Sequence, residues 1–152
     1  MEIDRATSTD ADGIAATFGA ARRTAMPWLP RLHTEAEDRR YFAGVIDECE
    51  VLVVRHEGQP VAFIALKDDM VEHLYARPEA QRAGIGSALL EAAKARSPGG
   101  LRLWTFQRNQ GARAFYAHHG FAELELTDGS ANEEREPDVL LAWTPAAARR
   151  RS

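Results

Sequence analysis

The sequence contains very little cysteine, with Cys49 alone among 152 residues. A single cysteine excludes an internal disulfide and any metal site built from several cysteines, which fits a reducing compartment. The N-terminus MEIDRATSTD also lacks the basic and apolar regions of a signal peptide. Long apolar runs are missing too, since no window approaches the roughly 18 residues of a membrane span. We therefore expect a cytoplasmic protein with no membrane partner.

Excess positive charge is missing as well, because the formal net charge is −4 at pH 7. Proteins that bind nucleic acids usually have the opposite balance, so we expect no nucleic-acid partner. The basic residues Arg149, Arg150 and Arg151 gather in residues 146–152, which we interpret as a disordered, solvated tail. The chain is 45% hydrophobic, enough for a core, and we interpret residues 1–145 as a single domain.

Hydrophobic periodicity predicts an alternation of strands and helices. A short strand at EIDRA precedes a helix that ends near Thr24, and Thr34 is the expected N-cap of a second helix. Further helices are expected from about Gly84 and over residues 109–119. The runs with strand periodicity are CEVLVVRH, VAFIALK, MVEHLYA, LRLWTF, FAELEL and DVLLAW. This order predicts a mixed sheet with helices on its faces.

The stretch QRAGIGSALLEAAKA places two glycines at the start of an apolar helical pattern. Apolar residues recur at helical spacing from Ile85 to Ala92, so one face of this helix should pack on the sheet. Its N-terminus combines unpaired amides with the positive end of the helix dipole, which attracts phosphate. Gly84 and Gly86 would let the backbone approach such an anion closely. The pattern therefore indicates a phosphate site.

Common nucleotide motifs do not match this stretch. A Walker loop needs GxxxxGK followed by Ser or Thr, and the sequence contains no such string. A dinucleotide fold needs GxGxxG directly after the first strand, whereas GIGSAL has leucine in the third glycine's place and lies in the middle of the chain. The remaining alternative is a glycine loop that only turns the chain.

Two longer passages argue for a specific family. QRAGIG fits the pattern Gln/Arg-x-x-Gly-x-Gly/Ala, and VEHLYARPEAQRAGIGSALLEAAKA resembles the cofactor-binding motif of the GNAT superfamily of N-acetyltransferases. RNQGARAFYAHHGFAELE is similar to the family's next segment, in which an asparagine opens a helix, an FY pair lies within it and GF leads to a strand. With the element order, the resemblance covers most of the chain from Cys49 onward.

The resemblance implies an α+β, GNAT-like fold: a mixed, mostly antiparallel sheet of about seven strands, about four helices, and splayed fourth and fifth strands. It also implies acetyl-CoA as the acetyl donor, with its pyrophosphate on the glycine loop and its pantetheine arm along the fourth strand. The residues expected to bind it are Leu74, Tyr75, Ala76, Gln81, Arg82, Ala83, Gly84, Ile85, Gly86, Ser87 and Asn109. Asn109 is also a good N-cap, and that role alone would explain it.

The implied reaction is direct attack of a primary amine on the thioester, which needs a base for the amine and an acid for the departing thiolate. Tyr116 matches the tyrosine of the family's FY pair and is the expected acid; helical spacing alone would make it a core residue. Glu72 is the expected base, because alternation along MVEHLYA puts it on one face with Met70, Leu74 and Ala76. Apolar neighbours would raise the pKa of its carboxyl group. The alternative is an exposed position or a cross-strand pair with Lys67.

The family's acceptor pocket draws on the segment between the first two helices and on the loop before the last strand, here MPWLPRLH and TDGSANEEREPD. Trp28 is expected to form an apolar wall, or else to plug the helix junction. Glu72, Glu133 and Glu134 are expected to favour a cationic acceptor, although a solvated charged loop explains the same residues. The acceptor is a small molecule or a peptide or protein amino group. No spacing of histidines and carboxylates indicates a metal site.

Two features of the whole protein stay open. The sequence is compatible with a non-catalytic module that binds CoA as a sensor or scaffold, although the presence of both Tyr116 and Glu72 favours an enzyme. A homodimer is common in the family that the sequence resembles, so a homodimer is possible here.

Overall fold

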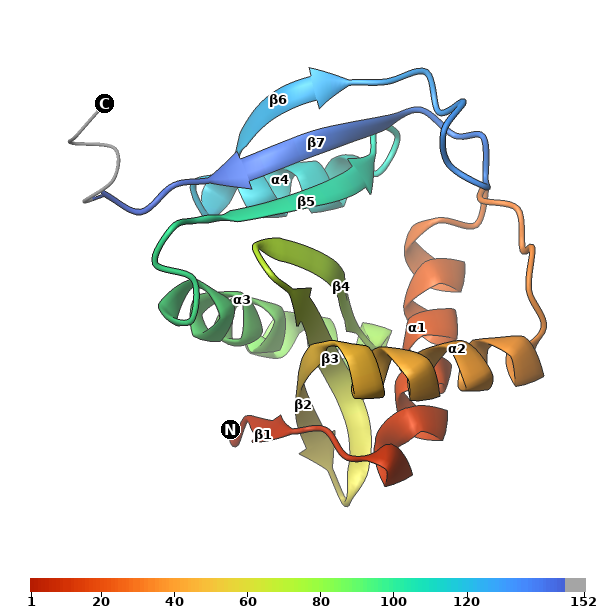
Figure 1. Ribbon diagram of the computed structural model, residues 1–152. Coiled ribbons are helices and arrows are strands. Elements are labelled where there is room, and N and C mark those ends of the chain that lie inside the picture. Colours follow the sequence, from red (N-terminus) through yellow and green to blue (C-terminus); the bar gives the residue numbers. More distant parts are fainter. Residues whose placement is uncertain (147–152) are drawn as a thin grey trace.

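Seven strands form one sheet in the order β1-β2-β3-β4-β5-β7-β6 (Figure 1). The computed structural model describes residues 1–146, so the arginines of the expected basic tail lie outside the described residues. The strands are β1 (Asp4–Arg5), β2 (Glu50–His56), β3 (Gln59–Lys67), β4 (Met70–Ala76), β5 (Leu101–Phe106), β6 (Ala122–Leu126) and β7 (Asp138–Trp143). The helices are α1 (Ala11–Ala25), α2 (Glu35–Glu48), α3 (Ile85–Ala95) and α4 (Gln110–His118), with short 3₁₀ helices η1 (Ser8–Asp10) and η2 (Pro78–Ala83).

The sheet divides where β4 meets β5. These two strands run parallel and pair through Met70 and Arg102, whereas the other neighbouring strands are antiparallel. The amide of Arg102 also donates to the carbonyl of Asp69 at 2.8 Å, which joins the strands at the same end. From there β4 and β5 separate, and Figure 1 shows the upper strands turned away from the lower ones. The fold, with its splayed fourth and fifth strands, is therefore the one expected.

Two hydrophobic cores lie on opposite faces of the sheet. Phe63 and Ile64 are consecutive and fully buried in β3, and the pleat turns their side chains to opposite faces. Phe63 packs with Phe42 of α2 in the core under α1 and α2, and Ile64 packs with Leu90 in the core under α3 and α4. Each such buried side chain contributes about 1.5–3 kcal/mol relative to an exposed one. Because β3 is buried on both faces, it contacts helices on both sides of the sheet, α1 and α2 on one side and α3 on the other.

Local signals set the starts of two helices. Thr34 and Glu37 form a capping box before α2, in which the amide of Glu37 donates to Thr34 Oγ1 at 3.1 Å and the amide of Thr34 donates to the Glu37 carboxylate at 2.8 Å. Asn109 caps α4, because its side-chain oxygen accepts from the amide of Ala112 at 3.1 Å. These bonds satisfy amides that have no partner within the helix. The N-cap role predicted for both residues is confirmed.

A β-bulge in β4 breaks the alternation that the sequence suggested. Ala65 pairs with His73 and Leu66 pairs with Val71, so Glu72 has no partner in β3. A bulge turns the extra residue out of the regular in-and-out pattern. The Glu72 side chain is exposed, and the apolar setting expected for it is wrong. The alternative of an exposed position for Glu72 is confirmed.

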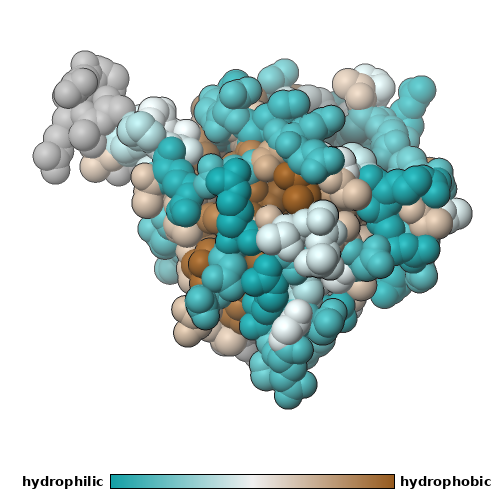
Figure 2. Space-filling model, turned by 60° about the horizontal axis from the view of Figure 1, so that its bottom comes forward, coloured by the Kyte–Doolittle hydropathy of each residue, from teal (hydrophilic) through white to brown (hydrophobic). Residues whose placement is uncertain are grey.

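Most of the apolar residues are enclosed. Figure 2, which brings the bottom of Figure 1 forward, shows hydrophobic residues on that face as small brown areas among hydrophilic ones. None of the helices within residues 1–146 is long and apolar enough to cross a membrane.

Candidate active site

The glycine loop leaves amides free at the start of α3. Gly84 has φ of 73°, a left-handed conformation that suits glycine, and a Cβ placed there would meet nothing within 4 Å. The first helical bond runs from the amide of Ala88 to the carbonyl of Gly84 at 3.0 Å. The amides of Ile85, Gly86 and Ser87 therefore precede the bonded part of the helix. An open loop with unpaired amides at a helix N-terminus fits an anionic group such as a pyrophosphate.

The last residues of β4 lie where this strand has separated from β5. Leu74 and Ala76 pack toward the core under α3 and α4, whereas the Tyr75 ring contacts Phe18 of α1 with centroids 5.0 Å apart. The side chain of Gln81 donates to the carbonyl of Ala76 at 3.0 Å. Gln81 therefore holds η2 against the end of β4, a role within the chain that the sequence did not reveal.

Tyr116 is the one buried residue of α4. Its ring packs between Phe115 and Phe121, with centroids 5.2 and 5.5 Å from its own. Burial, with a smaller effect from Tyr75, raises the pKa of Tyr116 above its usual range. The phenol is therefore protonated at neutral pH and has a proton to donate.

Ser87 makes a long-range contact. Its hydroxyl lies 3.0 Å from Nε2 of His119, and Nδ1 of His119 lies 3.3 Å from the carboxylate of Glu91. The ring of His119 also packs on Phe115, whose edge would be 3.7 Å from a Cβ at Gly86. The end of α4 therefore supports the first turn of α3. No sequence signal pairs residue 119 with residue 87.

A pocket of about 800 Å³ lies next to α1 and α2. Its wall comes from α1, the segment between α1 and α2, α2 itself, β4, and the loop between β6 and β7. Figure 1 shows that loop reaching down to the segment between α1 and α2. The expected acceptor segments are thus brought together. The lining residues are Phe18, Gly19, Arg22, Arg23, Met26, Pro27, Leu29, Pro30, Arg31, Leu32, His33, Glu37, Asp38, Tyr41, His73, Glu133 and Glu134.

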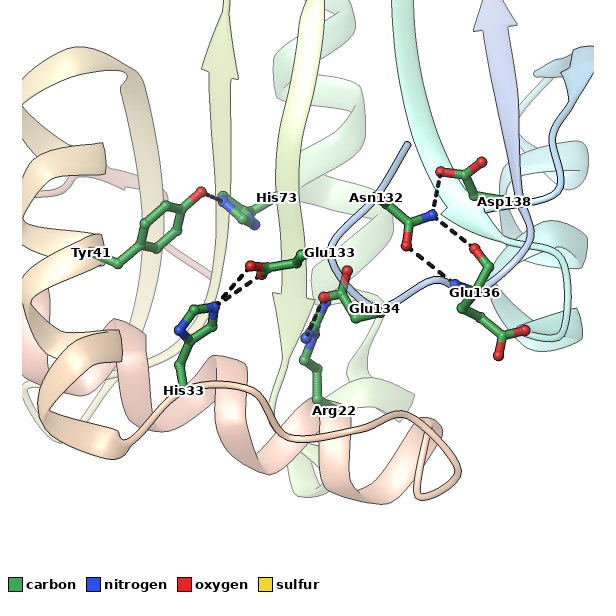
Figure 3. A network of polar contacts seen from close by, with 9 residues as sticks. All are labelled: Arg22, His33, Tyr41, His73, Asn132, Glu133, Glu134, Glu136 and Asp138. Carbon is green, nitrogen blue, oxygen red and sulfur yellow. Dashed lines mark hydrogen bonds and ion pairs between the residues drawn. The ribbon is translucent and has the colours of Figure 1, made fainter. Parts of the chain in front are cut away.

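Glu133 and Glu134 project from the β6–β7 loop to the pocket wall (Figure 3). Glu133 lies 3.0 Å from Nε2 of His33, and Glu134 lies 3.4 Å from the guanidinium of Arg22. The side chain of Glu134 is only 10% exposed, so it is not part of a freely solvated loop. The hydrogen bond to Glu133 and the charge of its carboxylate raise the pKa of His33 above its usual value.

Asn132 holds the neighbouring loop in shape. Its side-chain amide donates to the Glu136 carbonyl at 2.8 Å, and its side-chain oxygen accepts from the Glu136 amide at 3.2 Å (Figure 3). Gly129 is required there, because φ is 84° and a Cβ would lie 2.4 Å from the Glu136 carbonyl carbon. The two glutamates are therefore presented by a loop with a defined conformation.

The charge of the pocket differs from the acidic field expected for its loop. Arg22, Arg23 and Arg31 line the same wall as four carboxylates, those of Glu37, Asp38, Glu133 and Glu134. With nearly equal numbers of both signs, the pocket offers partners to a cation and to an anion. This mixed charge was not predictable from the sequence, because the arginines lie about a hundred residues before Glu133 and Glu134.

Trp28 is not among the residues that line the pocket. Its ring contacts Phe106 at the end of β5 with centroids 6.2 Å apart, and the guanidinium of Arg108 lies 4.2 Å above it. Leu29, the next residue, does line the pocket. Trp28 thus joins the segment after α1 to the loop after β5, a contact that neither the apolar wall nor the helix-junction alternative predicted.

His73 of β4 lies in the pocket wall. Its Nε2 lies 2.8 Å from the hydroxyl of Tyr41 (Figure 3), and its ring contacts those of Phe18 and Phe42. Burial, aided by the charge of Arg22, lowers the pKa of His73 to about 4. The imidazole is therefore neutral at pH 7, with one ring nitrogen bound to Tyr41. No sequence signal pairs residue 41 with residue 73.

Known proteins resemble this chain in sequence and in fold. A family model described as an acetyltransferase (GNAT) domain matches residues 47–123, half of the chain. An uncharacterized N-acetyltransferase of Methanocaldococcus jannaschii is 32% identical in an alignment of 108 residues that covers 60% of this chain and 48% of the relative. The peptidyl-lysine N-acetyltransferase YiaC of Escherichia coli is 29% identical over 93 residues, which are 60% of this chain and 61% of the relative.

The matches therefore span about half of the first relative and three fifths of the second. Among solved structures, the PaiA N-acetyltransferase of Thermoplasma acidophilum, crystallised in complex with coenzyme A, has a TM-score of 0.71 and 18% identity. That alignment covers 95% of this chain and 98% of the other, which shows a shared fold. Given the family match, the sheet with its splay and the glycine loop at the start of α3, the chain belongs to the acetyltransferase (GNAT) domain family.

Proposed function

We propose that this protein is an N-acetyltransferase that moves the acetyl group of acetyl-CoA to a primary amine. The observation that carries the proposal is the open glycine loop at the start of α3, which follows the end of β4 that has separated from β5. Acetyl-CoA supplies an acetyl group activated as a thioester. The residues proposed to hold it are the backbone from Arg82 to Ser87 for the pyrophosphate and the end of β4 for the pantetheine arm.

Tyr116 is proposed as the general acid. In the overall reaction the amine nitrogen bonds to the acetyl carbon, the carbon–sulfur bond breaks, and the sulfur leaves as a thiolate. The Tyr116 hydroxyl would donate a proton to that thiolate. With ordinary pKa values of about 10 for a phenol and about 8.5 for a thiol, full transfer is uphill by roughly 2 kcal/mol. The raised pKa of Tyr116 makes this proton transfer more costly. The phenolate that the transfer leaves must therefore regain a proton from water quickly.

Glu72 remains the proposed base, now in an exposed position at the bulge of β4. An exposed carboxylate reaches a substrate amine most easily through a bridging water. We expect Glu72→Gln to lower the rate most for acceptors that are largely protonated at the assay pH, because these need their proton removed. Initial rates for amines of graded basicity check this, with Glu79→Gln as an exposed control outside β4. Equal rates of wild type and variant across the series would remove Glu72 as the base.

The pocket between α1, α2 and the β6–β7 loop is proposed to hold the acceptor. It has the size of a small-molecule site, and Tyr75 of β4 lies behind its wall residue Phe18. Two of the four carboxylates that line the pocket, those of Glu133 and Glu134, suit an amine. YiaC acts on peptidyl lysine, which gives a lysine amino group on a peptide as the second type of acceptor to test.

A non-catalytic module that binds CoA is the second candidate function. The two functions are separated by measuring CoA release from acetyl-CoA with a panel of amines, for the wild type and for Tyr116→Phe. The enzyme predicts amine-dependent release that falls in the variant. A shift of the melting temperature by acetyl-CoA without any amine-dependent release would support the sensor. No shift and no release would contradict both.

A further inference from the structure

Arg22 has more hydrogen-bonding capacity than its neighbours use. It lies on α1 in the pocket wall, with its guanidinium carbon 4.7 Å above the ring of Phe18. Its Nε is buried and has no hydrogen-bond partner within residues 1–146. A buried donor without a partner costs free energy, so such groups usually serve a ligand or a water. Among the side chains of residues 1–146 that the structure describes, the Nε of Arg22 is the one buried nitrogen or oxygen without a hydrogen-bond partner.

The contact of Arg22 with Glu134 is also long. The two terminal nitrogens of Arg22 lie 3.4 and 3.5 Å from a single carboxylate oxygen of Glu134. Elsewhere in the protein, Arg113 meets Glu123 at 2.7 and 2.8 Å with both oxygens, and such pairs normally lie at about 2.7–2.9 Å. Phe18, Tyr75 and Glu134 therefore hold the guanidinium of Arg22, and none of them is a close bidentate partner.

We propose that the acceptor is an amino acid, a small molecule in which a primary amine and a carboxylate lie together, and that Arg22 binds its carboxylate. This inference rests on the proposed function. A guanidinium matches a carboxylate through two parallel hydrogen bonds, the geometry that Glu134 does not supply. When the carboxylate of the substrate binds Arg22, Glu134 becomes available to the amino group of the same substrate. The one long ion pair is then replaced by two close ones.

The pocket favours a zwitterion over a simple amine for the same reason. An amine without a carboxylate would draw Glu134 away from Arg22 and leave a largely buried guanidinium without a counter-ion, which is costly. The second ion pair of the wall, between His33 and Glu133, lies on the more exposed side. This ion pair would contact the side chain of the bound amino acid rather than its carboxylate.

Matched acceptors test the inference directly. Lysine and cadaverine share the same terminal amine and differ only in the carboxylate, and so do other amino acids and their decarboxylated amines. We expect the wild type to have a kcat/KM at least about tenfold higher for the amino acid of a pair, because only the amino acid brings a carboxylate to Arg22. A tenfold preference corresponds to about 1.4 kcal/mol. We expect Arg22→Gln to abolish this preference through KM, and Arg22→Lys to keep part of it. Arg39→Gln removes an exposed charge on α2 outside the pocket and should keep the full preference.

Equal kcat/KM of the wild type for both members of every pair would overturn the inference and leave the proposed function intact. A wild-type preference that is kept in Arg22→Gln would also overturn the inference and leave the proposed function intact. A shift of the melting temperature by acetyl-CoA shows that each variant is folded before its kinetics are compared. Absence of turnover with any amine contradicts the proposed function instead, so the two failures are distinguishable.

Discussion

At the scale of single residues, Tyr116 carries the proposed acid chemistry from a buried position. Tyr116→Phe removes the hydroxyl and keeps the ring contacts with Phe115 and Phe121. We expect kcat to fall about 100-fold, the lower end of what a positioned acid contributes, with little change in the KM for acetyl-CoA. Steady-state kinetics measure both constants. An unchanged kcat would show that Tyr116 is only a core residue, as its helical spacing allows.

His73 predicts a specific dependence of stability on pH. Its pKa is about 4 in the folded protein and about 6.5 when unfolded, so the unfolded chain binds the proton more tightly. Stability is therefore lost as the pH falls through 6.5 toward 4, and the loss reaches about 2 kcal/mol at pH 5. Tyr41, Arg22 and Tyr75 surround the ring, and the charge of Arg22 acts in the same direction as burial.

His73→Gln isolates this contribution, because glutamine does not titrate and still offers a partner to the Tyr41 hydroxyl. Urea unfolding at pH 7 and at pH 5 gives the free energy of unfolding of both proteins. We expect the wild type to lose about 2 kcal/mol more than the variant between these pH values. Parallel losses in both proteins would mean that His73 is protonated in the folded state at pH 5.

At the scale of elements, the start of α3 depends on one glycine more than on the other. Gly84 has φ of 73°, whereas Gly86 lies in the helix and a Cβ there would make an ordinary contact with Phe115 at 3.7 Å. We expect Gly84→Ala to lower the free energy of unfolding by about 1 kcal/mol and to weaken acetyl-CoA binding, because the loop must change conformation. Gly86→Ala adds the same methyl group, and we expect it to change neither the free energy of unfolding nor the affinity for acetyl-CoA.

Calorimetric titration with acetyl-CoA and urea unfolding of both variants provide the two readouts. Equal affinity for acetyl-CoA in Gly84→Ala and the wild type would show that the conformation of the loop does not matter for binding.

The elements themselves were largely predictable from the sequence, for local reasons. Thr34 and Asn109 mark helix starts through bonds to residues three positions on, and period-2 runs mark β2 to β7. The bulge at Glu72 was not predictable, since it depends on the register between β3 and β4. An alternating pattern in one strand holds no information about where its partner shifts.

At the scale of the whole molecule, the candidate site combines segments that are far apart in the chain. The glycine loop and the FY helix were found because each resembles a family motif. The pocket wall was found only in part, because Arg22, Tyr41 and His73 have no local pattern and meet Glu133 and Glu134 through the fold. A homodimer stays a prediction; β6 is an edge strand with Leu124 and Leu126 about 60% exposed, and sedimentation will measure the mass in solution.

We propose that the glycine loop and the splayed strands serve direct acetyl transfer to an amine. Acetyl-CoA with an isotope-labelled acetyl group, supplied together with the acceptor panel, tests this when the label is followed by mass spectrometry. We expect the label on the nitrogen of an acceptor, in an amount equal to the CoA released, and we expect Tyr116→Phe to slow its appearance. Acetyl-CoA that binds but leaves every acceptor unlabelled would contradict it.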